Sequence, residues 1–284
     1  MGPLVSTEWL ASRLGDPRLR VADVRWYLDP ARVGRDAYRD GHIPGAVFLD
    51  VDRDLSAPGG ARGGRKGRHP WPSPEQVAEV MGRAGIGPGT TVVAYDDQSG
   101  GTAARLWFVL RAYGHDGALV LDGGIAKWVA EGRPVETTET APPPALFLPI
   151  PRPGMVVEKV EMVDGAGREL VLDARAPQRY RGETEPIDPR AGHIPGAVNA
   201  PLAANLTRDA VPVFRSSEEL RAHYAALGAD RREPIVYCGS GVNACADLLA
   251  LEAAGLRGRL YAGSWSEWSS DPSLPAATGD EART

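Results

Sequence analysis

His42-Ile43-Pro44-Gly45-Ala46-Val47 occurs a second time in this chain, as His193-Ile194-Pro195-Gly196-Ala197-Val198. An exact repeat of this length indicates a tandem duplication. In each copy the Pro-Gly pair predicts a turn, and the Ala-Val pair begins a short strand. Each copy is also preceded by an apolar stretch that ends in Asp-x-Arg, at Asp23 and at Asp173. These stretches are typical of short buried strands.

The two halves continue to match after the hexapeptide. Ser73 and Ser216 each stand where a helix cap is expected, and the helices predicted behind them end at Gly85 and Gly228. An apolar, β-branched strand and then a second helix follow in each half. The predicted helices cover residues 77–84 and 102–113 in the first half and residues 220–227 and 244–254 in the second.

Alternating strands and helices predict an α/β protein with two tandem domains, each a central, mainly parallel sheet flanked by helices. The predicted limits are residues 1–138 for the first domain, 139–154 for a proline-rich linker and 155–284 for the second domain. With 284 residues, each half is long enough to bury a core of its own.

Composition excludes several classes of function. The net charge of -5 gives no reason to expect nucleic acid or a membrane surface as a partner. The two cysteines, Cys238 and Cys245, form neither a disulfide framework nor a zinc motif, so we expect no metal and no other cofactor. No signal peptide is visible at the N-terminus, and free cysteines fit a reducing compartment, so we predict a cytoplasmic protein.

The halves differ most at the loop after the central strand. The second half has Cys238-Gly239-Ser240-Gly241-Val242-Asn243 there, whereas the first half has Asp96 at the cysteine position. A glycine-rich loop between a strand and a helix gathers backbone N–H groups around an anion. We therefore predict that this loop stabilises the thiolate of Cys238 as a nucleophile, and that the copy with Asp96 is inactive. Cys245 is expected to pack in the core.

Two further stretches identify a family. The chain resembles the two-domain rhodanese sulfurtransferases in Tyr38-x-x-x-His42-Ile43-Pro44-Gly45-Ala46 and in Gly263-Ser264-Trp265-x-Glu267-Trp268. Its cysteine loop is similar to that of the 3-mercaptopyruvate sulfurtransferase branch. The resemblance implies that Cys238 takes sulfur from a small anionic donor as a persulfide. A thiophilic acceptor, such as cyanide, a small thiol or thioredoxin, would then remove that sulfur.

The resemblance also implies which residues bind the donor and assist the reaction. Arg179 is the expected substrate arginine and Arg190 is the candidate for a second one. Ser240, His69 and Asp52 are expected to assist the chemistry, because a histidine near the sulfur can move the proton that pyruvate formation requires. The rest of the predicted donor site is the loop itself: Gly239, Gly241, Val242 and Asn243. His42 and His193 are expected to be structural, since the inactive half repeats them.

Three other functions remain as alternatives. The first is a thiosulfate sulfurtransferase, although that branch usually has cationic side chains where this chain has Gly239 and Ser240. The second is a cysteine phosphatase, but no arginine closes the loop, which continues as Val242-Asn243-Ala244. The third is a non-catalytic rhodanese module for binding or sensing, which would most simply have lost the cysteine that this chain keeps.

Overall fold

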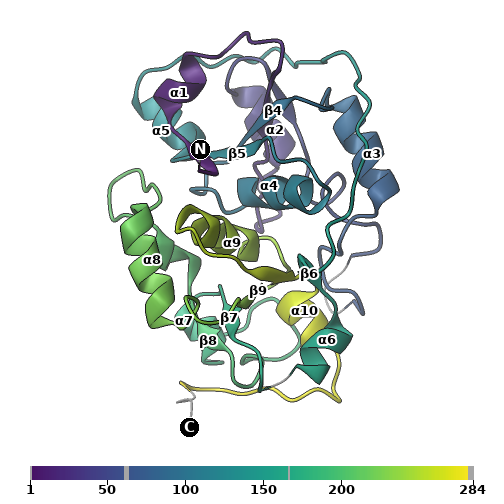
Figure 1. The fold of residues 1–284 in the computed structure, drawn as a ribbon. Helices are drawn as coiled ribbons and strands as arrows, with labels where there is room; N and C mark the ends of the chain where they lie inside the picture. Colours follow the sequence, from purple (N-terminus) through teal and green to yellow (C-terminus); the bar gives the residue numbers. More distant parts are fainter. Residues whose placement is uncertain (1, 61–63, 166, 281–284) are drawn as a thin grey trace. The chain divides into compact units, whose positions relative to one another are not determined.

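The computed structural model describes residues 2–60, 64–165 and 167–280 of the chain, and Figure 1 shows it as a ribbon. The chain forms two compact units. The first unit comprises Met1–Leu55, Pro72–Arg152 and Thr207–Phe214, and the second comprises Ser56–Trp71, Pro153–Leu206 and Arg215–Thr284. This division is less simple than the sequential domains predicted from the sequence, because each half contributes one segment to the other unit.

The first unit is a parallel sheet with helices between its strands, in the order β1-β5-β4-β2-β3. Helix α4 packs on β4 and β5, and α1 lies beside α5 (Figure 1). The elements are β1 (Leu4–Val5), α1 (Thr7–Ala11), β2 (Leu19–Asp23), α2 (Gly34–Asp40), β3 (Ala46–Phe48), α3 (Pro74–Arg83), β4 (Thr91–Tyr95), α4 (Ala103–Ala112), β5 (Ala118–Leu121) and α5 (Gly124–Ala130).

The second unit repeats this topology. Its parallel sheet has the order β6-β10-β9-β7-β8. Counted along the sequence within each unit, the strands follow the same order as in the first sheet. The duplication and the predicted α/β fold are thus confirmed. The elements are β6 (Val156–Val157), α6 (Lys159–Asp164), β7 (Val171–Asp173), α7 (Pro177–Tyr180), β8 (Val198–Asn199), the 3₁₀ helix η1 (Leu202–Asn205), α8 (Ser217–Ala226), β9 (Ile235–Tyr237), α9 (Ala244–Ala253), β10 (Arg259–Tyr261) and α10 (Ser264–Trp268).

The predicted helix signals form as expected. The Ser73 hydroxyl accepts a hydrogen bond from the Gln76 N–H at the start of α3, and Ser216 forms a reciprocal capping box with Glu219 at the start of α8. Gly85 lies just past the end of α3 with φ +69, a left-handed conformation that glycine adopts without steric cost. These helices therefore begin and end where local sequence alone places them.

The repeated hexapeptide serves the fold in both units. In the first unit the His42 ring stacks on Tyr38 and its Nδ1 contacts the Tyr38 carbonyl oxygen at 2.8 Å, while the Tyr38 hydroxyl donates to the Ala46 carbonyl at 2.8 Å. In the second unit His193 stacks on Tyr180 and contacts its carbonyl at the same distance. Both histidines are fully buried. The repeated histidines thus hold the turn, as predicted.

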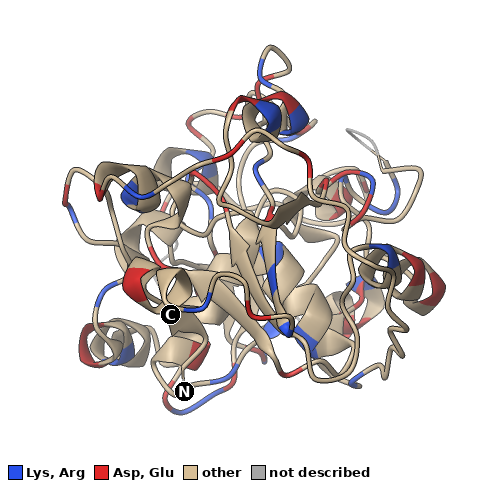
Figure 2. Ribbon diagram, turned by 90° about the horizontal axis from the view of Figure 1, so that it is seen from above, with Lys and Arg blue, Asp and Glu red and all other residues tan. Residues whose placement is uncertain are grey.

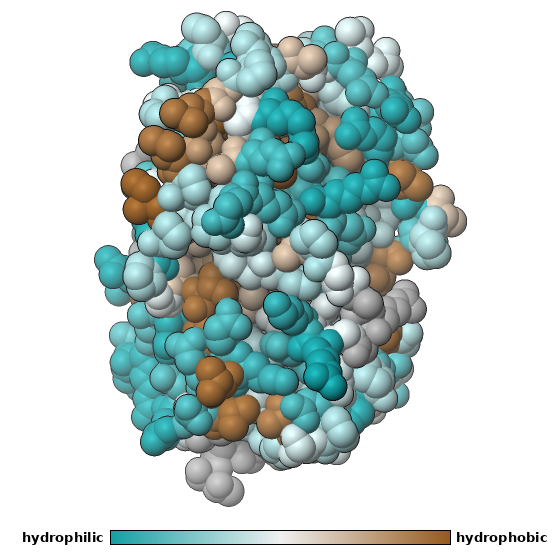
Figure 3. Space-filling model, turned by 90° about the vertical axis from the view of Figure 1, so that its right-hand side faces the viewer, coloured by the Kyte–Doolittle hydropathy of each residue, from teal (hydrophilic) through white to brown (hydrophobic). Residues whose placement is uncertain are grey.

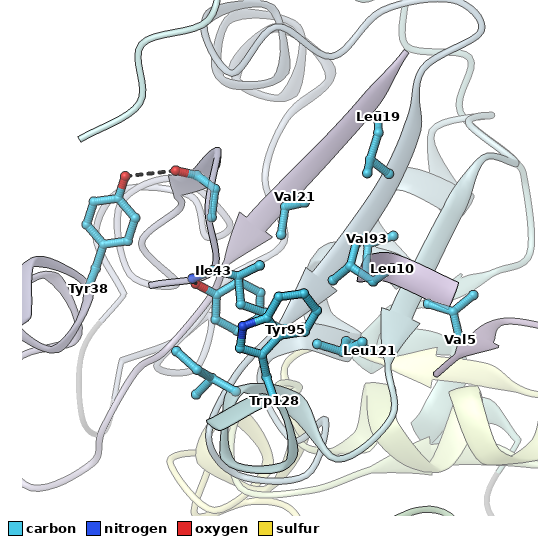
Figure 4. Close-up of a cluster of buried hydrophobic side chains, with 12 residues drawn as sticks. Val5, Leu10, Leu19, Val21, Tyr38, Ile43, Val93, Tyr95, Leu121 and Trp128 are labelled. Carbon is cyan, nitrogen blue, oxygen red and sulfur yellow. Dashed lines mark hydrogen bonds between the residues drawn. The ribbon is translucent and has the colours of Figure 1, made fainter. Parts of the chain in front are cut away.

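A cluster of buried apolar side chains forms the core on one face of the first sheet (Figure 4). Tyr95 lies in this cluster, and its hydroxyl accepts from the Ile43 N–H at 3.1 Å and donates to Asp23 at 2.7 Å. The second unit has the corresponding cluster around Tyr237, which accepts from the Ile194 N–H at 3.1 Å. The repeated turn is therefore tied to the central strand of each sheet, directly below the loop that differs between the halves.

The proline-rich stretch after α5 has no helix or strand of its own. It is anchored along the first unit, where the N–H groups of Ala145 and Ile150 donate to the carbonyls of Gly82 and Tyr113. Several of its apolar side chains are exposed, among them Leu146. On the face drawn in Figure 3, exposed apolar side chains form small groups separated by hydrophilic ones.

Charged residues of both signs are interspersed over the helices and loops (Figure 2). This distribution agrees with the small net charge of -5. None of the helices in the described part of the chain is both long enough and apolar enough to span a membrane.

Candidate active site

Cys238 begins the loop between β9 and α9 and is 4% exposed. Its N–H donates to the Ser264 hydroxyl at 3.2 Å, and its carbonyl accepts from the Trp265 N–H at 3.0 Å. The next carbonyl, of Gly239, accepts from the Ser266 N–H at 2.9 Å. The start of α10 therefore fixes the backbone on both sides of the thiol.

The loop of the first unit reveals what this backbone conformation can bind. Asp96 is fully buried, and its carboxylate accepts from the N–H groups of Gln98, Gly100, Thr102 and Ala103 at 2.7–2.9 Å. The Thr102 hydroxyl lies 3.1 Å from the same carboxylate. The side chain at the first loop position is thus an anion held by a ring of donors. Asp96 has a structural role there, in a copy that lacks the cysteine.

The two loops are equivalent in their surroundings. The Asp96 carbonyl accepts from the Ile125 N–H at 2.9 Å, which matches the bond between Trp265 and Cys238 in the second unit. Gly241 has φ +74, and a Cβ there would lie 2.4 Å from the Ala262 carbonyl oxygen, so only glycine fits. By this equivalence Cys238 stands at the loop position that Asp96 has in the first unit.

The remaining predicted loop residues differ in exposure. Val242 is buried, whereas Asn243 is exposed at the N-terminus of α9. The side chain of Asn243 makes no capping bond to this helix, because the backbone of Asn243 is already helical, at φ -65 and ψ -24. A capping side chain needs an extended backbone to reach back to the first turn.

Two guanidinium groups lie over the loop at Gly239. A Cβ built on Gly239 would lie 2.7 Å from Nη2 of Arg68 and 3.5 Å from Nη1 of Arg179. Arg179, on α7, is the arginine predicted for the donor. Arg68 was not predicted as a site residue; it lies in the segment Ser56–Trp71, which belongs to the second unit.

Two buried carboxylates hold these arginines. Asp188 binds Nη1 of Arg68 with one oxygen and Nη2 of Arg179 with the other, the latter at 3.2 Å. Glu185 binds Nη2 of Arg179 at 2.6 Å. Burial lowers the pKa of Arg68 and raises the pKa of Asp188, and the opposite charge of each partner acts against both shifts.

The same inserted segment brings a histidine to the loop. Nδ1 of His69 lies 2.8 Å from the Ser240 hydroxyl, and both side chains are buried. Asp52, the third member of the predicted group, belongs to the first unit, where it accepts from the Trp26 indole N–H at 2.8 Å. The prediction that Asp52 assists His69 joins residues of two units and stays a prediction.

Arg190 has a different environment. Its guanidinium donates to the carbonyls of Trp268, Ser269, Asp271 and Leu274 at 2.8–3.0 Å, around the end of α10. Each nitrogen of the group therefore already has a backbone acceptor. That Arg190 binds the donor stays a prediction.

Two other residues near the loop are structural. Arg175 is buried against Asp173, with its Nη2 at 2.6 Å from the carboxylate, and Arg25 repeats this contact with Asp23 in the first unit. Cys245 is fully buried in α9, and its thiol donates to the Gly241 carbonyl at 3.3 Å. Among the described residues, no group of three or more His, Cys, Asp or Glu side chains could hold a metal ion.

Comparisons with known proteins agree with this geometry. The family model of the rhodanese-like domain matches residues 6–131 and 157–271. A probable 3-mercaptopyruvate sulfurtransferase of Pseudomonas aeruginosa is 44% identical over 98% of both chains. A putative thiosulfate sulfurtransferase of Mycobacterium tuberculosis is 40% identical over 93% of this chain and 92% of its own. The solved 3-mercaptopyruvate sulfurtransferase of Leishmania major superposes with a TM-score of 0.83 at 30% identity, covering 94% of this chain and 74% of that one.

Proposed function

The chain belongs to the rhodanese family, and on this premise we propose that it is a 3-mercaptopyruvate sulfurtransferase that works through a persulfide on Cys238. The thiolate of Cys238 attacks the donor sulfur. The carbon–sulfur bond breaks with its electron pair remaining on carbon, which gives the enolate of pyruvate. An acceptor then attacks the outer sulfur, the S–S bond breaks, and its electron pair returns to Cys238 as the thiolate.

The observation that carries this proposal is the buried carboxylate of Asp96 in the loop of the first unit. Four backbone N–H groups donate to that carboxylate, and we expect the equivalent groups of the second loop to face the sulfur of Cys238. A persulfide is anionic near neutral pH, so the same donors stabilise the intermediate and the thiolate that leaves when the acceptor attacks.

Donor binding is assigned to Arg179 together with Arg68. A 2-oxo carboxylate offers two oxygens in one plane, and guanidinium groups bind such an anion through paired, directional hydrogen bonds. One nitrogen of each arginine lies near the Cβ position of Gly239, and we expect both nitrogens to donate to a ligand above the loop. This arrangement supports a small anionic donor.

Proton transfer is assigned to His69 and Ser240. The enolate of pyruvate must take up one proton, and a hydroxyl in contact with a histidine can deliver it. We propose that Asp52 orients this pair. Thiosulfate would need no such proton, because its leaving group is sulfite. The His69–Ser240 contact therefore favours 3-mercaptopyruvate as the donor.

The acceptor is a thiol or cyanide, and we propose thioredoxin as one physiological candidate because its thiolate is a good nucleophile for an outer sulfur. Both cysteines of the chain are free, which fits a reducing compartment and supports the cytoplasm as the location.

The test is mass spectrometry of the protein after treatment with 3-mercaptopyruvate and removal of the donor. We expect the wild type to gain one sulfur atom at Cys238 and the Cys238→Ser variant to gain none. Thiocyanate formation from cyanide should be lost in the same variant. A wild-type protein that gains no sulfur from either 3-mercaptopyruvate or thiosulfate would refute the proposal.

Thiosulfate is the second candidate donor, since a relative named for it is 40% identical. Initial rates with the two donors, measured side by side with cyanide as acceptor, decide between them. Faster turnover of thiosulfate would reverse the assignment of the donor and leave the role of Cys238 intact.

A further inference from the structure

Asp188 joins the two arginines that lie above the catalytic loop. Its side chain is fully buried, and its two oxygens bind Nη1 of Arg68 and Nη2 of Arg179. Arg68 comes from the inserted segment Ser56–Trp71, whereas Arg179 comes from α7. Asp188 is thus a single carboxylate that fixes two guanidinium groups from distant parts of the sequence against each other.

These contacts leave the opposite edges of both arginines available. Among the described residues, Nη2 of Arg68 and Nη1 of Arg179 make no hydrogen bond, and these are the nitrogens nearest to the Cβ position of Gly239. Nε of Arg68 is buried, also without an acceptor in the described part of the chain. The carboxylate therefore occupies one side of each guanidinium and leaves unpaired donors on the side that faces the loop.

Glu185 extends this support. It binds Nη2 of Arg179 at 2.6 Å and Arg175 at 3.4 Å, and it accepts from the N–H of Asp188 at 3.0 Å. Its side chain is 3% exposed. The backbone of Asp188 is therefore held by a second buried carboxylate, which also binds one of the two arginines.

The charges explain why such a support is needed. A buried guanidinium is costly unless a carboxylate is paired with it, and the side chain of Arg68 is only 10% exposed. Without Asp188, two like charges would lie side by side above the thiolate loop with no acid between them. Their mutual repulsion and loss of solvent would favour conformations in which Arg68 turns away.

We propose that Asp188, supported by Glu185, is a positioning residue that aims Nη2 of Arg68 and Nη1 of Arg179 at the carboxylate of the donor. Asp188 does not touch the reacting sulfur and takes no part in the transfer to the acceptor. Its contribution appears in the binding of the donor. This inference rests on the proposed function, because it concerns the same site.

The test compares the wild type with Asp188→Asn, which keeps the size of the side chain and removes its charge. With 3-mercaptopyruvate and cyanide, we expect KM for the donor to rise at least tenfold while kcat changes less than threefold. A second measurement preloads the persulfide with saturating donor and follows its removal by cyanide, and this rate should stay at the wild-type value. A residue with a merely structural role would alter both half-reactions together.

Asp116→Asn is the matched control. Asp116 also joins two arginines, Arg111 and Arg152, but it lies exposed in the first unit. We expect its KM and kcat to equal those of the wild type. Asp188→Glu, which keeps the charge but displaces it by one methylene, should give an intermediate KM and serves if the Asn variant does not fold.

Three outcomes would overturn the inference. The first is a KM for Asp188→Asn within twofold of the wild type, and the second is a removal of the persulfide by cyanide that slows as much as donor binding weakens. The third, if the Asn variant does not fold, is a wild-type KM for Asp188→Glu. Failure of the proposed function looks different. In that case the wild type forms no persulfide from the donor, and the result is known before any variant is measured.

Discussion

Replacing Asp96 by alanine tests the physical basis of the catalytic loop without touching the catalytic unit. The carboxylate of Asp96 accepts four backbone N–H bonds at 2.7–2.9 Å and is fully buried. In the Asp96→Ala variant these donors lose their acceptor together. Each buried donor left unsatisfied costs about 1–3 kcal/mol, partly recovered where water enters the space.

We expect a net loss of about 3–5 kcal/mol in the free energy of unfolding of the first unit, the range seen when a buried charged network loses one partner. For a unit of this size, that loss corresponds to a fall in the melting temperature of roughly 10 °C. Asp96→Asn keeps one acceptor oxygen, and its loss should be about half as large. The assay is thermal unfolding followed by far-UV circular dichroism, with sulfur transfer at 25 °C measured in parallel.

Asp16→Ala provides the control, since Asp16 accepts a backbone N–H from Arg18 in an exposed turn. We expect that variant to lose less than about 0.5 kcal/mol. A loss below about 1 kcal/mol for Asp96→Ala would mean that the loop does not need an anion at its first position. The argument that the same backbone stabilises the sulfur of Cys238 would then fail.

Three other substitutions probe the second unit. Gly239→Ala places a Cβ 2.7 Å from Nη2 of Arg68. The KM for the donor should therefore rise about tenfold, while removal of the persulfide by cyanide is unchanged. Equal effects on both steps would contradict the proposal that Arg68 acts in donor binding. Ser240→Ala removes the contact with His69, and kcat with 3-mercaptopyruvate should fall by about 10²-fold or more, whereas a comparable fall with thiosulfate would exclude a role in proton transfer. Asp247 has a pKa raised well above its usual value because it is fully buried, so the folded state keeps it protonated while the unfolded state ionises. Its contribution to stability is therefore present below about pH 4 and is lost as pH rises toward the folded pKa. In urea unfolding, Asp247→Asn should gain stability relative to the wild type as the pH rises. A stability difference between the two proteins that is the same at about pH 4 and about pH 7 would contradict this.

Much of the fold follows from short sequence patterns, because the decisive interactions are local. Ser73 and Ser216 each cap a helix by accepting a hydrogen bond from the N–H three residues further on. Gly85 follows the end of α3 with a positive φ. The exact repeat of the hexapeptide predicts two copies of one topology. The loop that begins at Cys238 could be located for the same reason, since the strand and the helix on either side of it follow one another in the sequence.

The residues that escaped prediction depend on contacts between distant segments. Arg68 reaches the loop only because the segment Ser56–Trp71 packs with the second unit, an exchange that leaves no periodic signal in the sequence. Asp188 has meaning only once Arg68 and Arg179 are both in place. The contacts of Arg190 were also beyond prediction, because its guanidinium binds carbonyls at the end of a helix about 80 residues further along the chain.

A comparison of the two loops distinguishes the residues needed for folding from those needed for catalysis. In the first loop, Asp96 is the acceptor for the converging N–H groups. In the proposed mechanism, Cys238 places at the same loop position a sulfur that accepts a second sulfur and then releases it. The arginine that faces the second loop, Arg179, precedes Tyr180, whereas Ala37 precedes the equivalent Tyr38 in the first unit. On the proposed function, the loop conformation therefore belongs to the fold of both units, and sulfur transfer requires in addition a nucleophile at the first loop position and guanidinium groups from outside the loop.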